Sequence, residues 1–229
     1  SPKEVIEMVK SWGWKAIAFT DHGVVQAFPE IYEASLNSGV KPIYGMEAYI
    51  FDDQFPVIAF PPEGNIDDFI YVAVDIETTG LSMDSDEIIE IGAVKIYKGE
   101  IIDTFHTFIK PKKSIPSSIS SLTGITNAMV ENAPSLNEAL DLFKDFIKDA
   151  VFVAHNAEFD SGFLRRDFYK LGIPFKNSVI DTVAFSAMVL DDIKNHKLDT
   201  VAKYLNIKLK NHHRATDDAN ALALIFIEL

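Results

Sequence analysis

The nine residues FIYVAVDIE, at positions 69–77, place the strongest constraint on the fold of this chain. Their side chains fall into two alternating sets, which is typical of a β-strand, where successive side chains point to opposite faces. One set is apolar throughout and consists of Ile70, Val72, Val74 and Ile76. A strand with such a face needs a sheet around it and a second layer packed against that face.

The opposite face of the same strand begins apolar and ends with two carboxylates. Tyr71 and Ala73 come first, and Asp75 and Glu77 follow. Because the two acids share a face, they lie about 6.5–7 Å apart along the strand. A lone D-x-E pair usually faces water, but Tyr71 and Ala73 indicate that this face is covered too. The turn-forming residues 78–80 (TTG) then lead the backbone away directly after the pair.

Composition limits the kind of metal that these carboxylates could bind. The 229 residues are 48% hydrophobic and 24% charged, as in a globular protein, and include no cysteine. Disulfides and thiolate metal sites are therefore excluded, so that any metal is held by oxygen or imidazole ligands. That donor set favours Mg²⁺ or Mn²⁺ over structural zinc.

Charge and hydropathy narrow the range of partners. A net charge of −13 argues against the broad basic surface of a protein that grips nucleic acid by counterion release. A nucleic-acid enzyme stays possible, because cations bound by clustered carboxylates supply local positive charge. No run approaches 18 apolar residues, and the N-terminus lacks the pattern of a signal peptide. We therefore expect a cytoplasmic protein with no membrane contact.

The chain divides by pattern into three segments. Residues 1–52 alternate between helical and strand periodicity and predict a βαβ fragment of a parallel sheet. Residues 53–67 are rich in Pro, Gly and Asp and predict a linker. Residues 68–229 begin with three strands, two of them joined by a hairpin turn at Lys98-Gly99, and continue with alternating helices and strands. This order predicts an α/β domain with a mixed five-stranded sheet flanked by helices.

Two of the predicted helices carry an acid on their apolar side. Asp160 shares a helical face with Phe163 and Leu164, and Asp218 shares one with Leu222 and Ile225. A buried carboxylate has to be paired, protonated or metal-bound.

Together with Asp75 and Glu77, these residues make four inward acids, which is the ligand set that a pair of divalent cations requires in phosphoryl transfer. Glycoside hydrolysis needs only two acids and would leave Asp160 and Asp218 unexplained. A base for the attacking water is then needed, and His213 lies five residues before Asp218. The adjacent His212 is an equally good candidate by position alone.

Three segments resemble the exonuclease motifs of the DEDD superfamily, in the subfamily whose third motif is H-x-A-x-x-D. They are VDIETTG (74–80), HNAEFDSGFL (155–164) and HRATDDANAL (213–222). The resemblance implies an RNase H-like fold and 3′→5′ removal of nucleotides from a strand end. It assigns metal-ligand roles to Asp75, Glu77, Asp160 and Asp218, and the general-base role to His213.

The same resemblance implies weaker roles for other residues. SLTGIT (121–126) is similar to a family segment that borders the terminal nucleotide, which makes Thr123 a substrate contact. Thr78 and Phe159 lie inside motifs and are expected to touch the same nucleotide. Asn156 fits an N-cap of the helix over 157–171. Asp181 is given no role.

Residues 16–50 resemble part of a PHP domain, with Asp21, His22 and Glu47 where that family has metal ligands. The other histidines of that pattern are absent, and one βαβ unit cannot form the family's seven-stranded barrel, so no PHP phosphoesterase activity is expected. A PHP segment followed by a DEDD exonuclease is similar to the arrangement in PolC-type bacterial DNA polymerase III. That resemblance implies a proofreading exonuclease acting on DNA 3′ ends, single-stranded or frayed, with polymerase domains of the same longer chain as partners.

Two other functions remain open at this stage. RNA exonucleases of the oligoribonuclease or RNase T kind have similar motifs, and the PHP flank is what favours DNA. A non-catalytic module that binds nucleic-acid ends is the alternative from another class, although a binder has no need of inward-facing acids.

Overall fold

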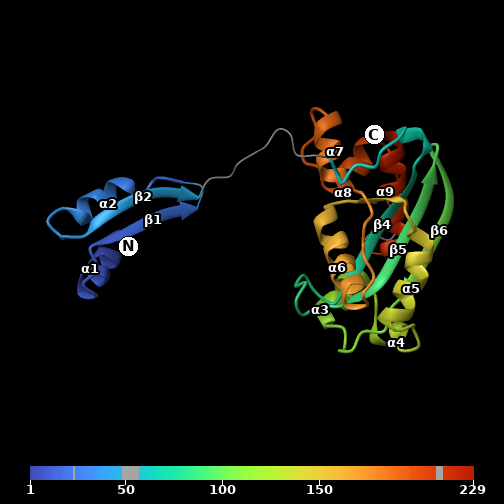
Figure 1. Ribbon diagram of the computed structural model, residues 1–229, viewed down its shortest axis with the longest axis horizontal. Coiled ribbons are helices and arrows are strands. Elements are labelled where there is room, and N and C mark those ends of the chain that lie inside the picture. The colour runs from blue at the N-terminus through green and yellow to red at the C-terminus, as the bar shows by residue number, and fades with distance from the viewer. Residues whose placement is uncertain (23, 48–56, 210–213) are drawn as a thin grey trace. The chain divides into compact units, whose positions relative to one another are not determined.

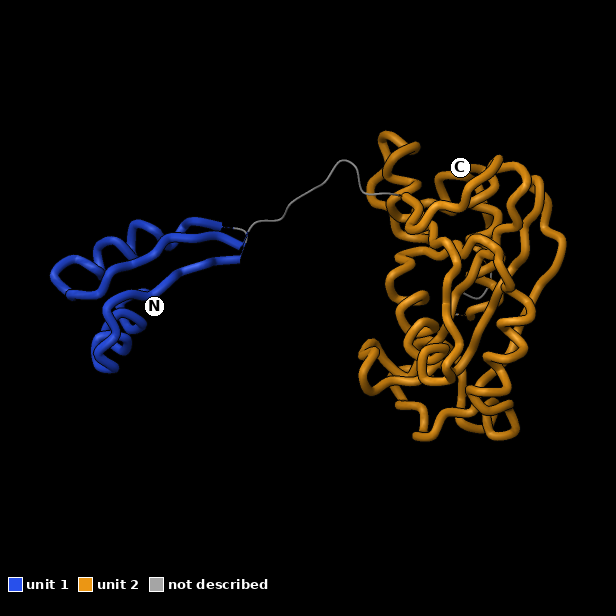
Figure 2. The backbone as a smooth tube through the Cα atoms, viewed as in Figure 1, with its two compact units in different colours: residues 1–54 blue, residues 55–229 orange. Residues whose placement is uncertain are grey.

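A computed structural model describes residues 1–22, 24–47, 57–209 and 214–229. The chain forms two compact units, Ser1–Gln54 and Phe55–Leu229, shown separately coloured in Figure 2. The division falls inside the segment predicted as a linker.

Unit 1 is a small parallel α/β layer. Its elements are α1 (Pro2–Ser11), β1 (Ala16–His22), α2 (Phe28–Ser35) and β2 (Lys41–Glu47). The strands pair in parallel from Ala16 opposite Lys41 to His22 opposite Glu47, as the βαβ pattern predicts. A capping box between Ser1 and Glu4 begins α1. Ile6 and Val9 of α1 and the partly buried Ala34 of α2 pack against Ile17 and Phe19 on one side of the strand pair.

Unit 2 is built around one mixed sheet. Its strands are β3 (Ile58–Ala59), β4 (Ile70–Thr78), β5 (Ile88–Tyr97), β6 (Glu100–Phe108), β7 (Val151–Ala154) and β8 (Val179–Asp181), in the order β3-β8-β7-β4-β5-β6. Strand β4 lies at the centre, antiparallel to β5 and parallel to β7. The β5–β6 hairpin turns at Lys98 and Gly99, whose φ angles of 52° and 76° are those that a two-residue type I′ turn needs.

Over the described residues of unit 2, the sheet has six strands, so the prediction of five is wrong by one. The extra strand, β3, pairs antiparallel with β8 through Ile58 opposite Ile180 and Ala59 opposite Val179. Two residues are too few to show the alternation by which a strand is recognised. The segment also sits among prolines, which are tolerated beside an edge strand because its outer N–H groups need no partner.

Helices cover both faces of the sheet (Figure 1). They are α3 (Ser117–Thr123), α4 (Asn127–Val130), α5 (Leu136–Ile147), α6 (Ala157–Lys170), α7 (Thr182–Val189), α8 (Leu198–Tyr204) and α9 (Ala215–Glu228), with a 3₁₀ turn at Ile66–Asp68. Phe143 of α5 and Phe163 of α6 pack on one face, against Val74. Leu222 of α9 packs on the other, against Ala73. Both faces of β4 are therefore buried, as its sequence predicts.

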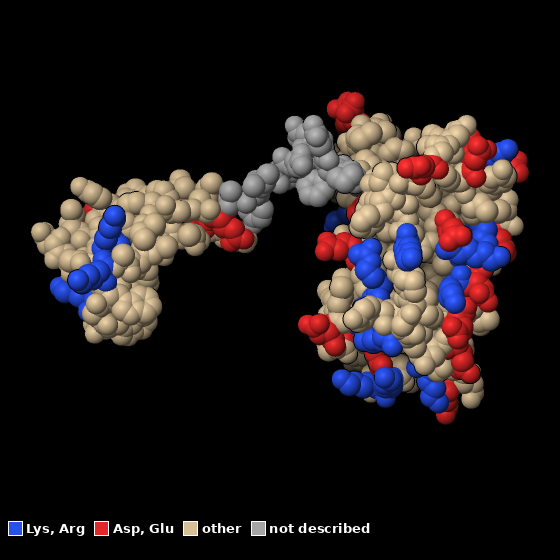
Figure 3. All heavy atoms as spheres, viewed as in Figure 1, with Lys and Arg blue, Asp and Glu red and all other residues tan. Residues whose placement is uncertain are grey.

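Two features of composition also appear in the structure. In the described part of the chain, the helices are all too short or too polar to cross a bilayer. Figure 3 shows acidic and basic side chains interspersed over the visible face of unit 2 rather than a single basic stripe. This agrees with the acidic net charge of −13.

The first prediction concerns the independence of the larger unit. Fragment 55–229 should fold alone, because the sheet, both helical layers and their core lie within it. Its thermal midpoint, followed by near-UV circular dichroism, should stay within about 4 °C of the matching transition in the 229-residue chain. Fragment 1–54 should lack a cooperative transition, since a two-stranded sheet is marginal in water. Loss of cooperative unfolding in fragment 55–229 would contradict this expectation.

Candidate active site

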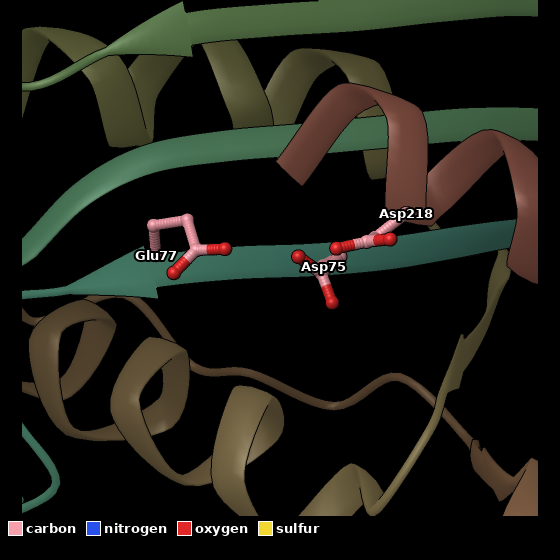
Figure 4. A group of neighbouring side chains, drawn as sticks. All are labelled: Asp75, Glu77 and Asp218. Carbon is pink, nitrogen blue, oxygen red and sulfur yellow. The ribbon is translucent and has the colours of Figure 1, made fainter. Parts of the chain in front are cut away.

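Three carboxylates meet where β4 passes under the first turns of α9. Asp75 and Glu77 come from β4 and Asp218 from α9, and Figure 4 shows their side chains turned toward one another. One ligand oxygen of each lies within 4.8 Å of the others. Asp218 is buried, and Asp75 and Glu77 are half-buried. The structure thus unites one acid pair from a strand with one acid from a helix 141 positions later in the chain, counted from Glu77 to Asp218.

A glycine in the neighbouring strand allows this approach. Gly92 of β5 lies opposite Asp75 in the sheet. A Cβ atom at Gly92 would lie 2.2 Å from the carbonyl carbon of Ala215, the first residue of α9. The helix therefore rests on bare backbone, and any larger residue would push it away from β4. This is the contact that brings Asp218 within reach of Asp75 and Glu77.

Asp160, the fourth predicted ligand, lies near these residues but is bonded differently. It is buried in the first turn of α6. Its Oδ1 accepts a hydrogen bond from the backbone N–H of Ile76 at 3.0 Å, so that α6 is tied to β4 between the two acids of the strand. Asp160 is not part of the three-carboxylate group. It is still close enough for its charge to raise the pKa of Asp75.

The carboxylates repel one another and are poorly solvated. Burial, and then the charges of Asp160, Glu77, Asp218 and Glu90, raise the pKa of Asp75 well above its ordinary value. Burial, followed by Glu90, Asp218 and Asp160, raises the pKa of Glu77 to about 8. Burial likewise raises the pKa of Asp160 to about 8. Without a counter-charge, Glu77 and Asp160 therefore retain protons near neutral pH.

The donor set fits a hard divalent cation. Converging carboxylate oxygens are the ligands that Mg²⁺ and Mn²⁺ prefer, and a bound cation would offset the repulsion that raises these pKa values. Asp75, Glu77 and Asp218 are the residues that would hold it. The geometry matches the prediction of a metal site made from the motifs, and the role of each residue stays a prediction.

The predicted general base lies outside the described residues. His213 and its neighbour His212 belong to the segment 210–213, and the structure resumes at Arg214. The choice between the two histidines therefore rests on the motif alone.

The predicted substrate contacts have internal partners in unit 2. The hydroxyl of Thr78 donates to the carbonyl oxygen of Gly80 at 2.6 Å. The hydroxyl of Thr123 donates to Ile119 and accepts from the N–H of Ile125, at the end of α3. Their contact with a nucleotide stays a prediction.

Phe159, the third predicted substrate contact, is partly buried. It lies on α6 and packs against Phe163, with ring centroids 5.0 Å apart. Its contact with a nucleotide is likewise a prediction.

Asp181, which the sequence left without a role, caps two helices. Asn156 is at the N-cap position of α6, as predicted, but its φ of 64° is left-handed and its side chain makes no capping bond. The Asp181 carboxylate accepts instead from the N–H groups of Asn156 and Ala157, at 3.1 and 3.2 Å. It also accepts from the N–H of Val183 at 2.8 Å, in the first turn of α7. One acid at the end of β8 therefore caps the N-termini of both helices.

In unit 1, two of the three residues suggested by the PHP resemblance are in contact. Nδ1 of His22 lies 2.6 Å from Oε2 of Glu47, at the carboxyl ends of β1 and β2. Asp21 precedes His22 and points to the other side of the strand, where its partner in register is Met46.

Glu90 is a buried acid beside the site that the sequence analysis missed. It lies in β5 opposite Glu77 and is fully buried. Burial alone would raise its pKa, but hydrogen bonds from His106, Arg214 and the N–H of Ala215 outweigh burial and lower it. Glu90 is therefore ionised at neutral pH. The sequence signals it only through a single acid inside the apolar run IIEIGAV (88–94).

Comparison with known proteins assigns the family. Residues 72–226 match the family model described as exonuclease, RNase T. The chain belongs to this exonuclease family. A PHP domain model matches residues 1–107. The two matches overlap over residues 72–107, which unit 2 places in β4, β5 and β6 of the exonuclease sheet.

A curated relative of this chain is the DNA polymerase III PolC-type protein of Caldanaerobacter subterraneus subsp. tengcongensis. It is 51% identical over 229 residues, which are 100% of this chain and 16% of the relative. The chain thus spans about one sixth of the length of the relative that it matches. The resemblance to the PolC-type arrangement is confirmed.

Solved structures confirm the RNase H-like fold. The nuclease domain of 3′hExo, described as a DEDDh family member bound to rAMP, has a TM-score of 0.62 at 22% identity, covering 72% of this chain and 93% of that one. Exonuclease X, in complex with 5′ overhanging duplex DNA, has a TM-score of 0.58 at 24% identity, and the match covers 69% of this chain and 89% of that one.

The raised pKa values predict how stability depends on pH. Glu77 has an ordinary pKa of 4.5 and a folded pKa of about 8, so its protonated form favours the folded state. That contribution is fully present below pH 4.5 and is lost as the pH rises through 8.

In chelator, the thermal midpoint of unit 2 should therefore fall by several degrees, roughly 4 °C or more, between pH 5.5 and 8.0. Added Mg²⁺ should raise the midpoint more at pH 8.0 than at pH 5.5, since cation and protons compete. A chelated protein that is more stable at pH 8.0 would contradict the sign.

A substitution at Asp75 isolates the cost of crowding the acids. Asp75→Asn removes a carboxyl group whose ionisation is disfavoured in the folded state by burial and by the neighbouring acids, and it leaves the shape of the side chain almost unchanged. In chelator at pH 8.0, it should raise the thermal midpoint by about 2–4 °C, and it should abolish the further rise caused by Mg²⁺. Asp141→Asn is the matched control, because Asp141 is exposed on α5, and it should do neither. A lower midpoint for Asp75→Asn in chelator would show that the acids do not repel as inferred.

Proposed function

We propose that this chain is a metal-dependent 3′→5′ exonuclease that removes nucleoside 5′-monophosphates from DNA 3′ ends and proofreads for a replicative DNA polymerase III of PolC type. The observation that carries the proposal is the group of three carboxylates, Asp75, Glu77 and Asp218, with ligand oxygens within 4.8 Å of one another. Membership of the exonuclease family and 51% identity to a PolC-type polymerase over the whole chain support it.

The cations that we propose are two Mg²⁺ or Mn²⁺ ions. Asp75, Glu77 and Asp218 would hold one of them, and Asp160, which stays beside Asp75 through its bond to Ile76, would serve the other. When bound, the ions polarise the scissile phosphate and lower the pKa of the attacking water.

The chemical step assigns separate work to the residues of this chain. His213 takes a proton from the water whose oxygen attacks phosphorus, in line with the bond to the 3′ oxygen of the preceding nucleotide. That P–O bond breaks, and its oxygen takes up a proton and becomes the new 3′ hydroxyl of the shortened strand. The released product is a nucleoside 5′-monophosphate. Thr78, Thr123 and Phe159 would border the terminal nucleotide during this step.

The partners follow from the relatives. Exonuclease X is described in complex with duplex DNA, and the PolC-type relative extends far beyond the part matched here. We therefore propose a single-stranded or frayed primer 3′ end as substrate, polymerase domains of a longer chain as partners, and a cytoplasmic location.

The test is a time course on a 5′-labelled single-stranded DNA oligonucleotide in Mg²⁺ or Mn²⁺. We expect a ladder of products that shortens from the 3′ end and is lost in chelator. The cleavage rate should fall by about 10³-fold or more in Asp75→Ala, since that variant removes a proposed cation ligand. Asp141→Asn is again the matched control and should cleave at the wild-type rate.

A matched RNA oligonucleotide separates the proposed activity from its alternative. RNA degraded much faster than DNA would identify an RNA exonuclease instead. Folded protein that binds both oligonucleotides but cleaves neither would favour a non-catalytic binding module and overturn the proposal.

The proposal also predicts a link between pH and the demand for cation. Glu77 and Asp160, each with a pKa of about 8, have to lose protons before they accept metal. The Mg²⁺ concentration that gives half-maximal cleavage should therefore rise by roughly tenfold or more between pH 8 and pH 6. Cleavage rates measured over a Mg²⁺ series at each pH check this. An unchanged Mg²⁺ requirement would show that these carboxylates do not bind the activating cation.

A further inference from the structure

Glu90 is a buried acid with three hydrogen-bonding partners, His106, Arg214 and Ala215, and the proposed function gives it no role. Its Oε1 lies 2.8 Å from Nε2 of His106 and 3.0 Å from Nη2 of Arg214. Its Oε2 accepts from the backbone N–H of Ala215 at 3.1 Å and from Nε of Arg214 at 3.4 Å. Each carboxylate oxygen thus serves two donors, while the side chain itself is fully buried.

These partners place Glu90 at the beginning of α9. Arg214 is the N-cap residue of that helix and makes no capping bond with its own side chain, and Ala215 is the first helical residue. The carboxylate of Glu90 therefore supplies the acceptor that the first N–H of the helix needs. Its negative charge also lies at the positive end of the helix.

The same contacts reach Asp218 within one turn. The N–H of Asp218 donates to the carbonyl oxygen of Arg214 at 3.0 Å, so the position of Arg214 sets that of Asp218. Across the sheet, Glu90 lies opposite Glu77 in the register of β4 and β5. One buried side chain thus connects the strand that carries two of the acids to the helix that carries the third.

A buried ion pair is an expensive way to join a helix to a sheet, since apolar packing is often equally stable or more so. The pair does, however, fix direction. The guanidinium contacts both oxygens of Glu90, and its Cζ lies 5.4 Å from the ring centroid of Phe108. Apolar contacts would allow α9 to slide on Gly92, whereas these directional bonds hold it in one register.

We propose that Glu90 is a positioning residue, which acts through Arg214 and the N–H of Ala215 to set the first turn of α9 and so place Asp218 against Asp75 and Glu77. The inference rests on the proposed function, in that the three carboxylates are taken as the cation site. It is tested on cation binding, which needs no nucleic acid.

A simpler account would make Glu90 only a source of negative charge that attracts cations. The two accounts predict opposite effects for Arg214→Gln. If only the field matters, removing a positive charge beside Glu77 should tighten cation binding. If Glu90 acts by holding α9, the loss of its partner should weaken cation binding. Glu90→Gln weakens binding in both accounts, so Arg214→Gln decides between them.

The experiment measures Mn²⁺ binding to the chelator-stripped 229-residue chain at pH 7.5, with free Mn²⁺ counted by electron paramagnetic resonance. We expect Glu90→Gln and Arg214→Gln each to weaken binding by about tenfold or more, the usual effect of losing a group that orients a metal ligand. The double variant should bind Mn²⁺ no more weakly than the more impaired single variant, because both changes break the same Glu90–Arg214 contact.

Asp167→Asn is the matched control. Asp167 is also a buried acid, with Arg166 at 2.6 Å and Lys170 at 2.9 Å, but it lies on α6, on the other side of the sheet from α9. We expect a lower thermal midpoint and Mn²⁺ binding within about twofold of wild type, since losing a buried ion-pair partner costs stability wherever it occurs. Equal weakening in Asp167→Asn would mean that general loosening explains the effect, and would overturn the inference.

Tight binding by Arg214→Gln, equal to or better than wild type, would also overturn the inference, as would the absence of Mn²⁺ binding in the wild-type chain. Cleavage assays on the same variants then separate this inference from the proposed function. Positioning predicts a turnover number reduced by about tenfold or more, with the KM for a DNA oligonucleotide within about threefold. Wild-type protein that binds Mn²⁺ but cuts no DNA would sink the proposed function and leave the inference to the binding data.

Discussion

The close approach of α9 to Gly92 is the contact on which the candidate site depends. A helix normally stands off a sheet by the length of the side chains between them, which would leave Asp218 far from β4. Here the first residue of α9 lies on bare backbone, where even a Cβ atom would come within 2.2 Å of Ala215. The strand supplies two acids at fixed spacing and the helix supplies one, so a shift of α9 changes all distances between Asp218 and the pair at once. Glu90 and Arg214 then hold the helix in the register that the glycine permits.

The folded structure brings the acids of the site together although burial and neighbouring charges disfavour their ionised forms. Burial and the charges of nearby acids raise the pKa of Glu77 to about 8 and that of Asp75 well above its ordinary value, and burial raises the pKa of Asp160 to about 8. The free-energy cost of this arrangement is offset by packing elsewhere in unit 2. Strand β4 is buried on both faces, between α5 and α6 on one side and α9 on the other. This packing holds the carboxyl groups close together although burial and neighbouring charges disfavour their ionisation. Readiness to bind a divalent cation and reduced stability in its absence therefore have one physical origin.

Much of this architecture could be predicted from the sequence, because it follows from local patterns. Alternation identified β4 and its two buried faces, and helical spacing identified the inward acids Asp160 and Asp218. Contacts between distant residues could not be predicted in this way. Nothing near Gly92 shows that α9 rests on it, and nothing near Asp181 shows that it caps both α6 and α7. Strand β3 was missed for a related reason, since two residues acquire strand geometry only through their pairing with β8.

Glu90 illustrates where pattern and physics differ. By alternation it is one polar residue in an apolar strand, and nothing local distinguishes a functional acid from a tolerated one. Its partners make the difference: Arg214 comes 124 positions later, and with Ala215 it brings the start of a helix to the carboxylate. Asp167 is as deeply buried, yet its own bonds go only to Arg166 and Lys170, which are neighbours on α6. Arg166 then donates to carbonyl oxygens of Met83 and Asp86, in the loop between β4 and β5, and none of these bonds reaches α9. A buried acid bound within one element adds local stability. A buried acid that joins two elements, each carrying a ligand of the same site, also sets the geometry of that site.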